Sequence, residues 1–323
     1  MPASGALRLA SPQFGDLTFQ GKEQGLAKQT RPAERGAISR RAFLKKFGKI
    51  ALGGALVGTG GFLYSYNFET TWIEVTRMRL PLARLSSDFG SYRIVHISDL
   101  HLDGRTQPEY LTKLVRLVNE QEPDMIAFTG DFVTFTLGKF APELRSTLNH
   151  LRARDGVVAV LGNHDHLAGP DMVGSVIREG GATVLRNGVL TLERAGTSLH
   201  VCGVDDVWEG LPRLDCVLAR LPRAGAAILL VHEPDFADTA STSGRFDLQI
   251  SGHSHGGQVR LPLVGAPVLP KYACKYPIGV YRVGDMLLYT NRGLGMLPPR
   301  FRFLCRPEIT VLDLNAERHA SGS

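Results

Sequence analysis

The sequence predicts an α/β protein in which short, largely apolar strands alternate with amphipathic helices. Strand-like runs such as 93–98 and 125–129 are five or six residues long and end in polar or glycine residues. The segment 109–121 between them places apolar residues three and four positions apart, which is typical of a helix packed on one face. Short polar motifs directly follow five of the expected strands, and ligand sites of open α/β sheets form at such strand ends.

A basic leader precedes the predicted domain. Residues 1–38 are rich in glycine, alanine and basic residues without sustained periodicity, and we expect them to be disordered. Residues 1–50 contain ten Lys and Arg against three Asp and Glu, so the rest of the chain is close to neutral despite the formal net charge of +6. Because nucleic-acid binding needs a basic surface on the folded part, we expect no nucleic-acid partner, and a nuclease is disfavoured.

Residues 39–66 resemble a twin-arginine export signal. Arg40 and Arg41 are followed by an aromatic residue and a leucine, and then by a glycine-containing apolar run over 50–66. This order predicts export by the twin-arginine translocase to the periplasm or cell envelope. No A-x-A cleavage site follows the run, so retention as an inner-membrane anchor stays open. A basic helix and linker in a cytoplasmic protein is the alternative interpretation.

One domain is predicted over residues 71–315, with 316–323 as a disordered tail. Its first half alternates strands and helices, and its second half is rich in strands. The expected strands are 71–80, 93–98, 125–129, 157–161, 198–204, 227–231, 248–251, 259–261, 279–283, 286–290 and 309–314, and the expected helices are 109–121, 143–152 and 171–179.

The four cysteines contain no C-x-x-C pair, so neither a zinc ribbon nor a thioredoxin-type redox site is indicated. A disulfide between Cys202 and Cys216, or between Cys274 and Cys305, is open for an exported domain. Four free thiols are the alternative.

Five short motifs supply the candidate functional residues, each placed just after an expected strand. They are Asp99-Leu100-His101, Gly130-Asp131, Gly162-Asn163-His164-Asp165, His232 and Gly252-His253-Ser254-His255. Imidazole nitrogens suit Zn, Fe or Mn, and carboxylate or amide oxygens admit Mn or Mg. Together they provide enough ligands for two adjacent divalent metals and leave one histidine over. That combination predicts hydrolysis of a phosphate ester or anhydride.

The ordered motif set, from Arg93 to about Val259, resembles the calcineurin-like metallophosphoesterases, and most of all their bacterial, twin-arginine-exported, single-domain members. The resemblance implies a four-layer α-β-β-α sandwich of two mixed sheets flanked by helices. It further implies two divalent metal ions, with Mn, Fe and Zn all open. The implied ligands of one metal are Asp99, His101, Asp131 and His255, and those of the other are Asp131, Asn163, His232 and His253, so that Asp131 bridges them.

The implied reaction is cleavage of a phosphodiester or pyrophosphate by a hydroxide that bridges the metals. His164 follows a ligand and would contact the phosphoryl oxygen or the leaving group, a role worth roughly 10²–10⁴-fold in rate. Asp165 is a candidate to orient the imidazole of His164. A lipid-linked substrate of the cell envelope is open, as is a non-catalytic metal-binding envelope protein.

Two segments that mix cations with aromatic residues follow the last motif. Residues 271–276 and 298–303 are expected to form a basic, aromatic rim that contacts an anionic lipid headgroup or a membrane surface. Ordinary exposed loops with buried aromatic rings are the alternative.

Overall fold

The computed structural model describes residues 40–316, so the predictions for the leader and for nearly all of the tail lie outside the described residues. The chain divides into two units, residues 1–53 and 54–323. Helix α1 (Arg40–Asn67) contains the boundary between them, and the glycines of this segment do not interrupt it. Within the described 277-residue stretch from 40 to 316, no helix has the length and hydropathy needed to cross a bilayer.

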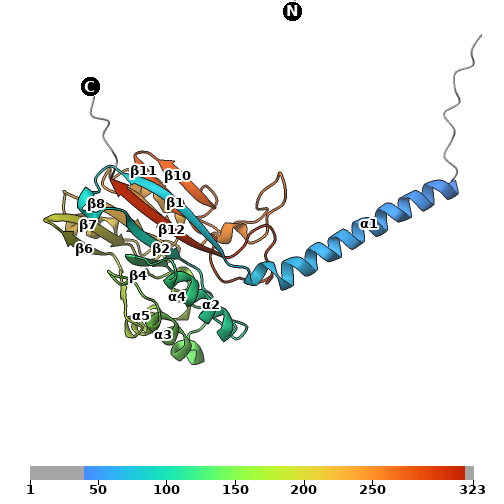
Figure 1. The fold of residues 1–323 in the computed structure, drawn as a ribbon, viewed down its shortest axis with the longest axis horizontal. Coiled ribbons are helices and arrows are strands. Elements are labelled where there is room, and N and C mark those ends of the chain that lie inside the picture. The colour runs from blue at the N-terminus through green and yellow to red at the C-terminus, as the bar shows by residue number, and fades with distance from the viewer. Residues whose placement is uncertain (1–39, 317–323) are drawn as a thin grey trace, which may run out of the picture. The chain divides into compact units, whose positions relative to one another are not determined.

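Two six-stranded mixed sheets form the core of the second unit (Figure 1). In the first sheet, β2 to β5 are parallel, β12 is antiparallel to β2, and β1 is parallel to β12. Its order is β1 (Glu74–Leu82), β12 (Glu308–Ala316), β2 (Tyr92–Ile97), β3 (Met125–Thr129), β4 (Val157–Val160) and β5 (Ala182–Val184).

The second sheet has a parallel centre and antiparallel edges, because β11, β9, β8 and β7 run in one direction and the edge strands β10 and β6 oppose them. Its order is β10 (Gly279–Val283), β11 (Met286–Thr290), β9 (Leu248–Ser251), β8 (Ala226–Leu230), β7 (Thr197–Gly203) and β6 (Gly188–Arg194).

Helices cover the outer faces of both sheets. The helices on the first sheet are α2 (Pro108–Asn119), α3 (Ala141–Asn149) and α5 (Pro170–Glu179), and those on the second are α6 (Leu214–Arg220) and α7 (Ala237–Ser241). The short helix α4 (Asn163–Ala168) begins inside the third motif. Single 3₁₀ turns lie at Glu69–Thr71, Ser87–Phe89, Gly138–Phe140, Pro234–Phe236 and His255–Gly257.

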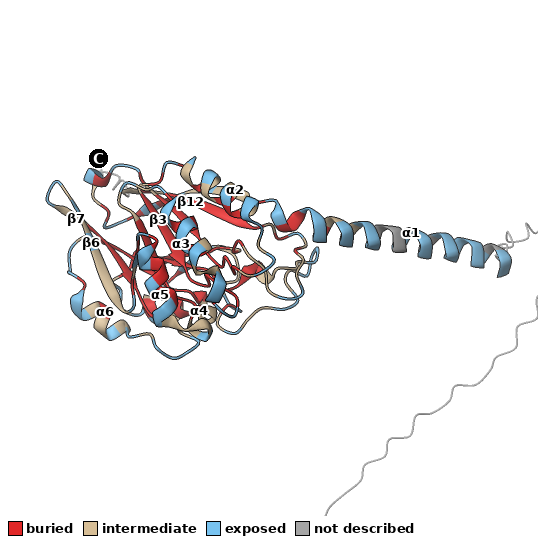
Figure 2. Cartoon of the chain, turned by 90° about the horizontal axis from the view of Figure 1, so that it is seen from below, coloured by how far each residue is buried: buried red, intermediate tan, exposed pale blue. Residues whose placement is uncertain are grey.

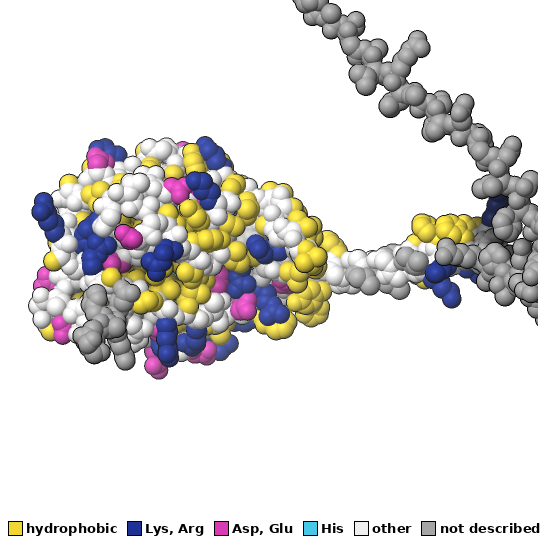
Figure 3. Space-filling view, turned by 90° about the horizontal axis from the view of Figure 1, so that it is seen from above, with side chains coloured by type: hydrophobic (Ala, Val, Ile, Leu, Met, Phe, Trp, Pro, Cys, Tyr) yellow, Lys and Arg dark blue, Asp and Glu magenta, His cyan; other side chains and the backbone are white. Residues whose placement is uncertain are grey.

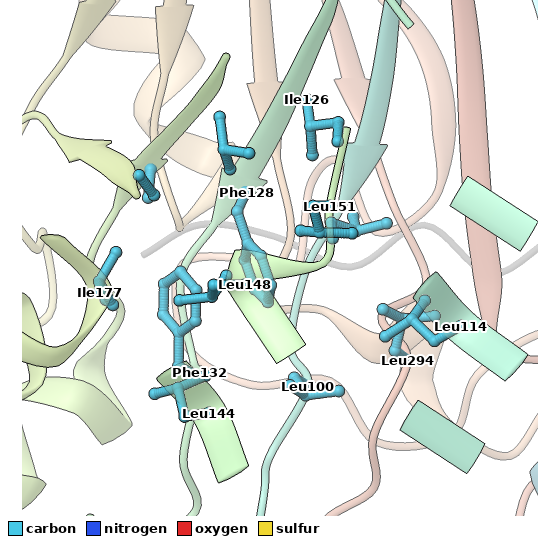
Figure 4. Packing of buried hydrophobic residues seen from close by; sticks show 14 of the residues in the cluster. Leu100, Leu114, Ile126, Phe128, Phe132, Leu144, Leu148, Leu151, Ile177 and Leu294 are labelled. Carbon is cyan, nitrogen blue, oxygen red and sulfur yellow. The ribbon is translucent and has the colours of Figure 1, made fainter. Parts of the chain in front are cut away.

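Three clusters of buried apolar side chains fill the three interfaces between these four layers. Figure 4 shows the first, where Phe128 and Phe132 of the sheet side meet Leu144 and Leu148 of α3. Because successive side chains of a strand point to opposite faces, Ile126 joins this cluster while its neighbours join the one between the sheets. Strands inside the sheets, such as β3, β4, β8 and β9, are accordingly buried on both faces (Figure 2). The predicted four-layer α/β fold is confirmed.

Several predicted details differ from the structure. Residues 259–261 form only isolated bridges, Val259 to Phe303 and Leu261 to Gly265, because Pro262 and Gly265 turn the chain at once. The first strand continues through Pro81, which is tolerated because β1 lies at a sheet edge. Strand β6 was not predicted, since its side chains are only partly buried.

All four cysteines are free, so neither of the disulfides left open by the sequence is formed. Cys202 is buried in the second sheet, and this burial raises the pKa of its thiol to about 12.

Candidate metal centre

All five motifs meet where strands of both sheets end at their carboxyl termini. β2, β3 and β4 of the first sheet, and β8 and β9 of the second, each end within three residues of a candidate ligand. In chain order these ligands are Asp99 and His101, Asp131, Asn163, His232, and His253 with His255. Two sheets therefore contribute to one site, and the backbone amide of His253 ties them together by donating to both carboxylate oxygens of Asp99 at 3.1 Å.

Asp99, His101 and His255 form the first group of potential ligands. The Nε2 atoms of His101 and His255 face each other at 3.0 Å, and His255 Nε2 lies 3.5 Å from Asp99 Oδ1. All three side chains are buried. Nitrogen lone pairs that converge at this distance fit coordination of one shared cation.

Asp131, His232 and His253 form the second group. His232 Nε2 lies 3.2 Å from Asp131 Oδ2 and 3.1 Å from His253 Nδ1. The other nitrogen of each ring donates to a backbone carbonyl, from His232 Nδ1 to Thr129 at 2.6 Å and from His253 Nε2 to Lys271 at 2.9 Å. Carbonyl acceptors of this kind fix the tautomer of a metal-binding histidine and leave its remaining nitrogen free as a ligand.

Asp131 connects the two groups, and Asn163 offers a further buried oxygen after β4. The Oδ2 atom of Asp131 lies 3.5 Å from His101 Nε2 in addition to its contact with His232. The Oδ1 atom of Asn163 is buried and has no hydrogen-bond partner among residues 40–316. A buried amide oxygen without a donor is costly, and a cation would satisfy it. The donor set therefore fits two divalent metals that share Asp131.

The backbone at the site is strained. Five ligand residues have left-handed φ angles, namely Asp99 (52°), His101 (47°), Asp131 (55°), His253 (64°) and His255 (50°). Each such residue costs about 1–3 kcal/mol and persists only where its surroundings impose it. A Cβ on Gly162 would overlap the Asp131 carboxylate, and one on Gly252 would overlap that of Asp99, so glycine is required at both close approaches.

Burial controls the protonation of the ligands. It lowers the pKa of His101 and of His253 to about 3, and it holds the pKa of His255 well below its usual range. Burial raises the pKa of Asp99 to about 6. Burial also opposes ionisation of Asp131, but the charge and hydrogen bond of His232 outweigh it, and the net pKa of Asp131 falls below its ordinary value. Neutral imidazoles, as at His101, His253 and His255, and an ionised shared carboxylate are the protonation states that bind metals. Burial also lowers the pKa of His232, but the charge and hydrogen bond of Asp131 outweigh it and hold that pKa well above its usual value.

His164 lies beside the first group of ligands, with its ring 4.8 Å from that of His101 between centroids. Its backbone amide donates to Asp131 Oδ1 at 2.9 Å, and its Nδ1 donates to the carbonyl of Thr134. The side chain is half-buried. His164 is thus fixed through Nδ1, and it forms a third group of potential ligands with His101 and Asp131.

Asp165 does not orient His164, so that expectation was wrong. Its carboxylate accepts hydrogen bonds from four backbone amides, those of Asp131 (2.8 Å), Phe132 (2.9 Å), Val133 (3.3 Å) and Gly162 (3.0 Å). Asp165 is the third residue of α4. Its carboxylate therefore reaches backbone N–H groups at the start of the helix, which have no acceptor within the helix. Asp165 therefore joins the second motif to the third and places Asp131 for its metal-binding role.

The sequence analysis did not identify the segment 291–295, whose backbone amides form hydrogen bonds with the backbone of the first motif. Leu294 donates to the carbonyl of Ser98 at 3.0 Å, and Gly295 donates to that of Asp99 at 2.6 Å. The glycine-containing run that follows β11 was the available signal, because every other site loop also follows a strand.

The sequence analysis expected Arg302 to belong to an exposed rim. In the structure it is buried and holds the segment 291–295 in place. It is fully buried and donates to the carbonyls of Arg292 (3.0 Å), Gly293 (3.1 Å), Gly295 (2.6 Å) and Cys305 (3.0 Å). Of the other expected rim cations, Arg300 pairs with Asp103 and Lys275 with Asp238. On the face of the domain seen in Figure 3, basic and acidic side chains are interspersed.

The expected rim segment 271–276 lies next to the candidate metal centre. The carbonyl of Lys271 accepts the hydrogen bond of His253, and the Lys271 ammonium lies 4.3 Å from the centre of the Tyr272 ring. Trp208, which the sequence analysis did not single out, lies 5.8 Å from the His253 ring and contacts Tyr272 edge-on. This side of the site is therefore aromatic.

A four-layer sandwich with buried Asp, His and Asn side chains at its strand ends defines the class of metal-dependent phosphoesterases. The family model described as "Calcineurin-like phosphoesterase" matches residues 92–257. The chain belongs to this family and is a metallophosphoesterase, a hydrolase.

Three relatives illustrate the range of similarity. The uncharacterized metallophosphoesterase YkuE of Bacillus subtilis is 39% identical, covering 86% of this chain and 98% of its own length. Phosphodiesterase YaeI of Escherichia coli is 32% identical over 86% of this chain and 99% of its own. The UDP-2,3-diacylglucosamine pyrophosphatase LpxG of Chlamydia muridarum is 26% identical over 78% and 92%.

Proposed function

We propose that the protein hydrolyses a phosphodiester or pyrophosphate bond at this site, using two divalent metals that share Asp131. The observation that carries the proposal is the position of the Asp131 carboxylate, which lies within 3.5 Å of imidazole nitrogens from both ligand groups. The unsatisfied amide oxygen of Asn163 supports it. Mn, Fe and Zn all suit this mixture of nitrogen and oxygen donors.

The residues of the chain divide the work between holding metals and handling the substrate. Asp99, His101, Asp131 and His255 would hold one ion, and Asp131, Asn163, His232 and His253 the other. Bound there, two divalent ions acidify water and offset the charge of the phosphoryl oxygens. The Nδ1–H of His164 is committed to Thr134, so a protonated His164 donates from Nε2 to the phosphoryl or leaving oxygen.

A lipid-linked substrate of the cell envelope is part of the proposal. The name of LpxG describes a pyrophosphatase that acts on a diacylated sugar nucleotide, and YaeI is named a phosphodiesterase. The paired Arg40 and Arg41 before an apolar segment support export by the twin-arginine translocase. These features favour a site at the periplasmic or envelope side, close to a membrane surface.

Metal content and hydrolysis test the proposal together. Protein purified without chelator should contain about two divalent metals per chain by elemental analysis, and it should hydrolyse bis-p-nitrophenyl phosphate with Mn²⁺. Chelation should abolish turnover, and readdition should restore it. Protein with far less than two metals after reconstitution, and no hydrolysis with Mn²⁺, Fe²⁺ or Zn²⁺, would contradict the enzyme and favour a non-catalytic role.

His164→Ala separates catalysis from metal binding. We expect it to retain both metals and to lose roughly 10²–10⁴-fold in kcat, because it removes only the proton donor. His150→Ala, at an exposed histidine on the outer helical layer, is the matched control and should remain fully active. Normal turnover by His164→Ala would remove this residue from the mechanism.

A further inference from the structure

A cavity of about 520 Å³ lies between helix α2, the end of helix α1 and the segment that supports the first metal loop. Its walls include Leu100, Tyr110, Leu294 and Met296, together with Tyr66 from α1. Polar groups in the wall are already engaged, since Tyr110 Oη donates to the Leu294 carbonyl at 2.8 Å and Lys113 Nζ to that of Thr71 at 3.0 Å. The volume falls in the range of sites that bind small organic ligands, roughly 300–1,000 Å³.

The cavity adjoins the metal centre through the first motif. His101, a metal ligand, lies in its wall directly after Leu100. Arg300, also in the wall, pairs with Asp103, and the Asp103 carboxylate lies 3.5 Å from the hydroxyl of Thr134. The carbonyl of Thr134 in turn accepts the hydrogen bond of His164. Arg300, at the cavity wall, is thus three contacts away from His164.

Charge and exposed apolar surface are distributed unequally around this cavity. Arg105, Lys113 and Arg300 bring three cationic side chains to its wall, against the single carboxylate of Glu109. Near its Tyr66 end, the neighbouring Phe68 and Trp72 side chains are 64% and 50% exposed. Cations suit a phosphate group, and an exposed aromatic cluster suits the headgroup level of a lipid layer.

We propose that this cavity binds the aliphatic chain of an amphiphilic phosphate ester while its phosphate occupies the metal centre. The proposal rests on the function proposed above and specifies its substrate class. An aliphatic chain is the favoured occupant because Leu100, Leu294 and Met296 give the wall an apolar stretch, and because the polar ends of the Tyr110, Lys113 and Arg300 side chains already have partners.

A homologous series of substrates tests the cavity. The metal-loaded enzyme is assayed with p-nitrophenyl alkyl phosphates from methyl to decyl, each kept below its critical micelle concentration. We expect kcat/KM to rise about two- to fourfold with each buried methylene and then to level off when the cavity is full. A flat series, with the methyl ester still hydrolysed, would overturn the cavity proposal and leave the hydrolase function intact.

Variants that fill the cavity should flatten the series. Met296→Trp and Thr71→Phe each add bulk to a residue of the cavity wall, so each should reduce the ratio of kcat/KM between the octyl and methyl esters to near one. Met172→Trp is the matched control, because Met172 is an exposed methionine on α5 outside the cavity wall. It should keep the wild-type ratio. A wild-type ratio in both filled variants would overturn the proposal.

Isothermal titration calorimetry tests the occupant of the cavity through binding affinity, without relying on turnover. Dodecyl phosphate should bind wild-type protein at least about 100-fold more tightly than ethyl phosphate, with a negative heat-capacity change from apolar burial. Met296→Trp should remove that advantage. If no ester of any length is hydrolysed, the proposed function fails, but this binding difference still supports the cavity. Equal binding of the two phosphates by the wild-type protein would overturn it.

Discussion

The core between the two sheets and the loops at the strand ends are equally buried but differ in chemistry. Ile94 and Ile228 lie in the core, whereas Asp99 and Asp131 lie in the loops. The core consists of apolar side chains on regular strands, a combination that lowers the free energy of the folded state. The strand ends combine buried carboxylates with left-handed backbone, a combination that raises it. The domain therefore uses stability from its interior to hold a metal site that is unfavourable without its metals.

The largest expected effect is that of Asp131→Asn on turnover. The substitution removes the carboxylate shared by both ligand groups, so kcat/KM should fall on the order of 10³-fold or more, and metal content should drop below two per chain. Elemental analysis and hydrolysis of bis-p-nitrophenyl phosphate measure both. Asp313→Asn, which only loses an ion pair with Arg93 on the first sheet, serves as control. Two retained metals with normal turnover would show that Asp131 is not shared.

The opposite pattern is expected in the core. Ile228→Ala leaves a cavity between the sheets and should lower the free energy of unfolding by about 2–5 kcal/mol in urea denaturation. Metal content and kcat of the folded variant should stay near wild type. Val280→Ala, at a half-exposed site on β10, should cost much less. A loss of kcat without a loss of stability would contradict the division between core and site.

Metal removal tests how the two regions are coupled. Each metal at 100 times its dissociation constant should stabilise the fold by about 2.7 kcal/mol, which corresponds to a Tm shift of roughly 5–10 °C per metal for a domain of this size. Differential scanning calorimetry with and without chelator measures the shift. It should shrink in Asp131→Asn. An unchanged Tm in the chelated wild type would mean that the site is not strained in the way described.

The smallest expected effect concerns an ion pair near the edge of the site. Burial lowers the pKa of His166, but its hydrogen bond to Asp205 at 2.8 Å and the charge of that carboxylate raise it more, so the net pKa lies above its usual value. Protonated His166 therefore stabilises the fold below about pH 6.5, and this contribution is lost as the pH rises through the raised pKa.

The stability difference between wild type and His166→Gln should accordingly be larger at pH 6 than at pH 8.5, as measured by urea denaturation. His150→Gln, at an exposed position, should show no such dependence. An equal difference in stability at both pH values would show that protonated His166 does not stabilise the fold.

The sequence was sufficient to predict the parts of the molecule that local patterns encode. Strand β3 occupies 125–129 and β9 occupies 248–251, as expected, because apolar runs bounded by motif residues mark buried strands. The family resemblance implied that Asp131 and His232 lie together, and in the structure His232 Nε2 lies 3.2 Å from Asp131 Oδ2. Strand direction brings the loops of each sheet to one edge, but it does not by itself bring the two sheets together.

What the sequence could not predict depends on groups distant in the chain. The partners of Asp165 are amides from two loops, and the choice among them depends on the approach of β3 to β4. Arg302 was taken for an exposed cation because arginine is rarely buried without partners, and its four carbonyl acceptors appear only once residues 291–305 have folded around it. The cavity beside His101 likewise requires α1 and α2 to be placed together.

The support of the first metal loop by residues 291–302 has a consequence for biosynthesis. Asp99 and His101 leave the ribosome about 200 residues before Arg302 does, and synthesis at about 5–20 residues per second makes that interval roughly 10–40 s. During this time the loop lacks the carbonyl and amide contacts that hold its left-handed residues. The first group of potential ligands and the contacts that support it are therefore complete only after translation has passed Arg302.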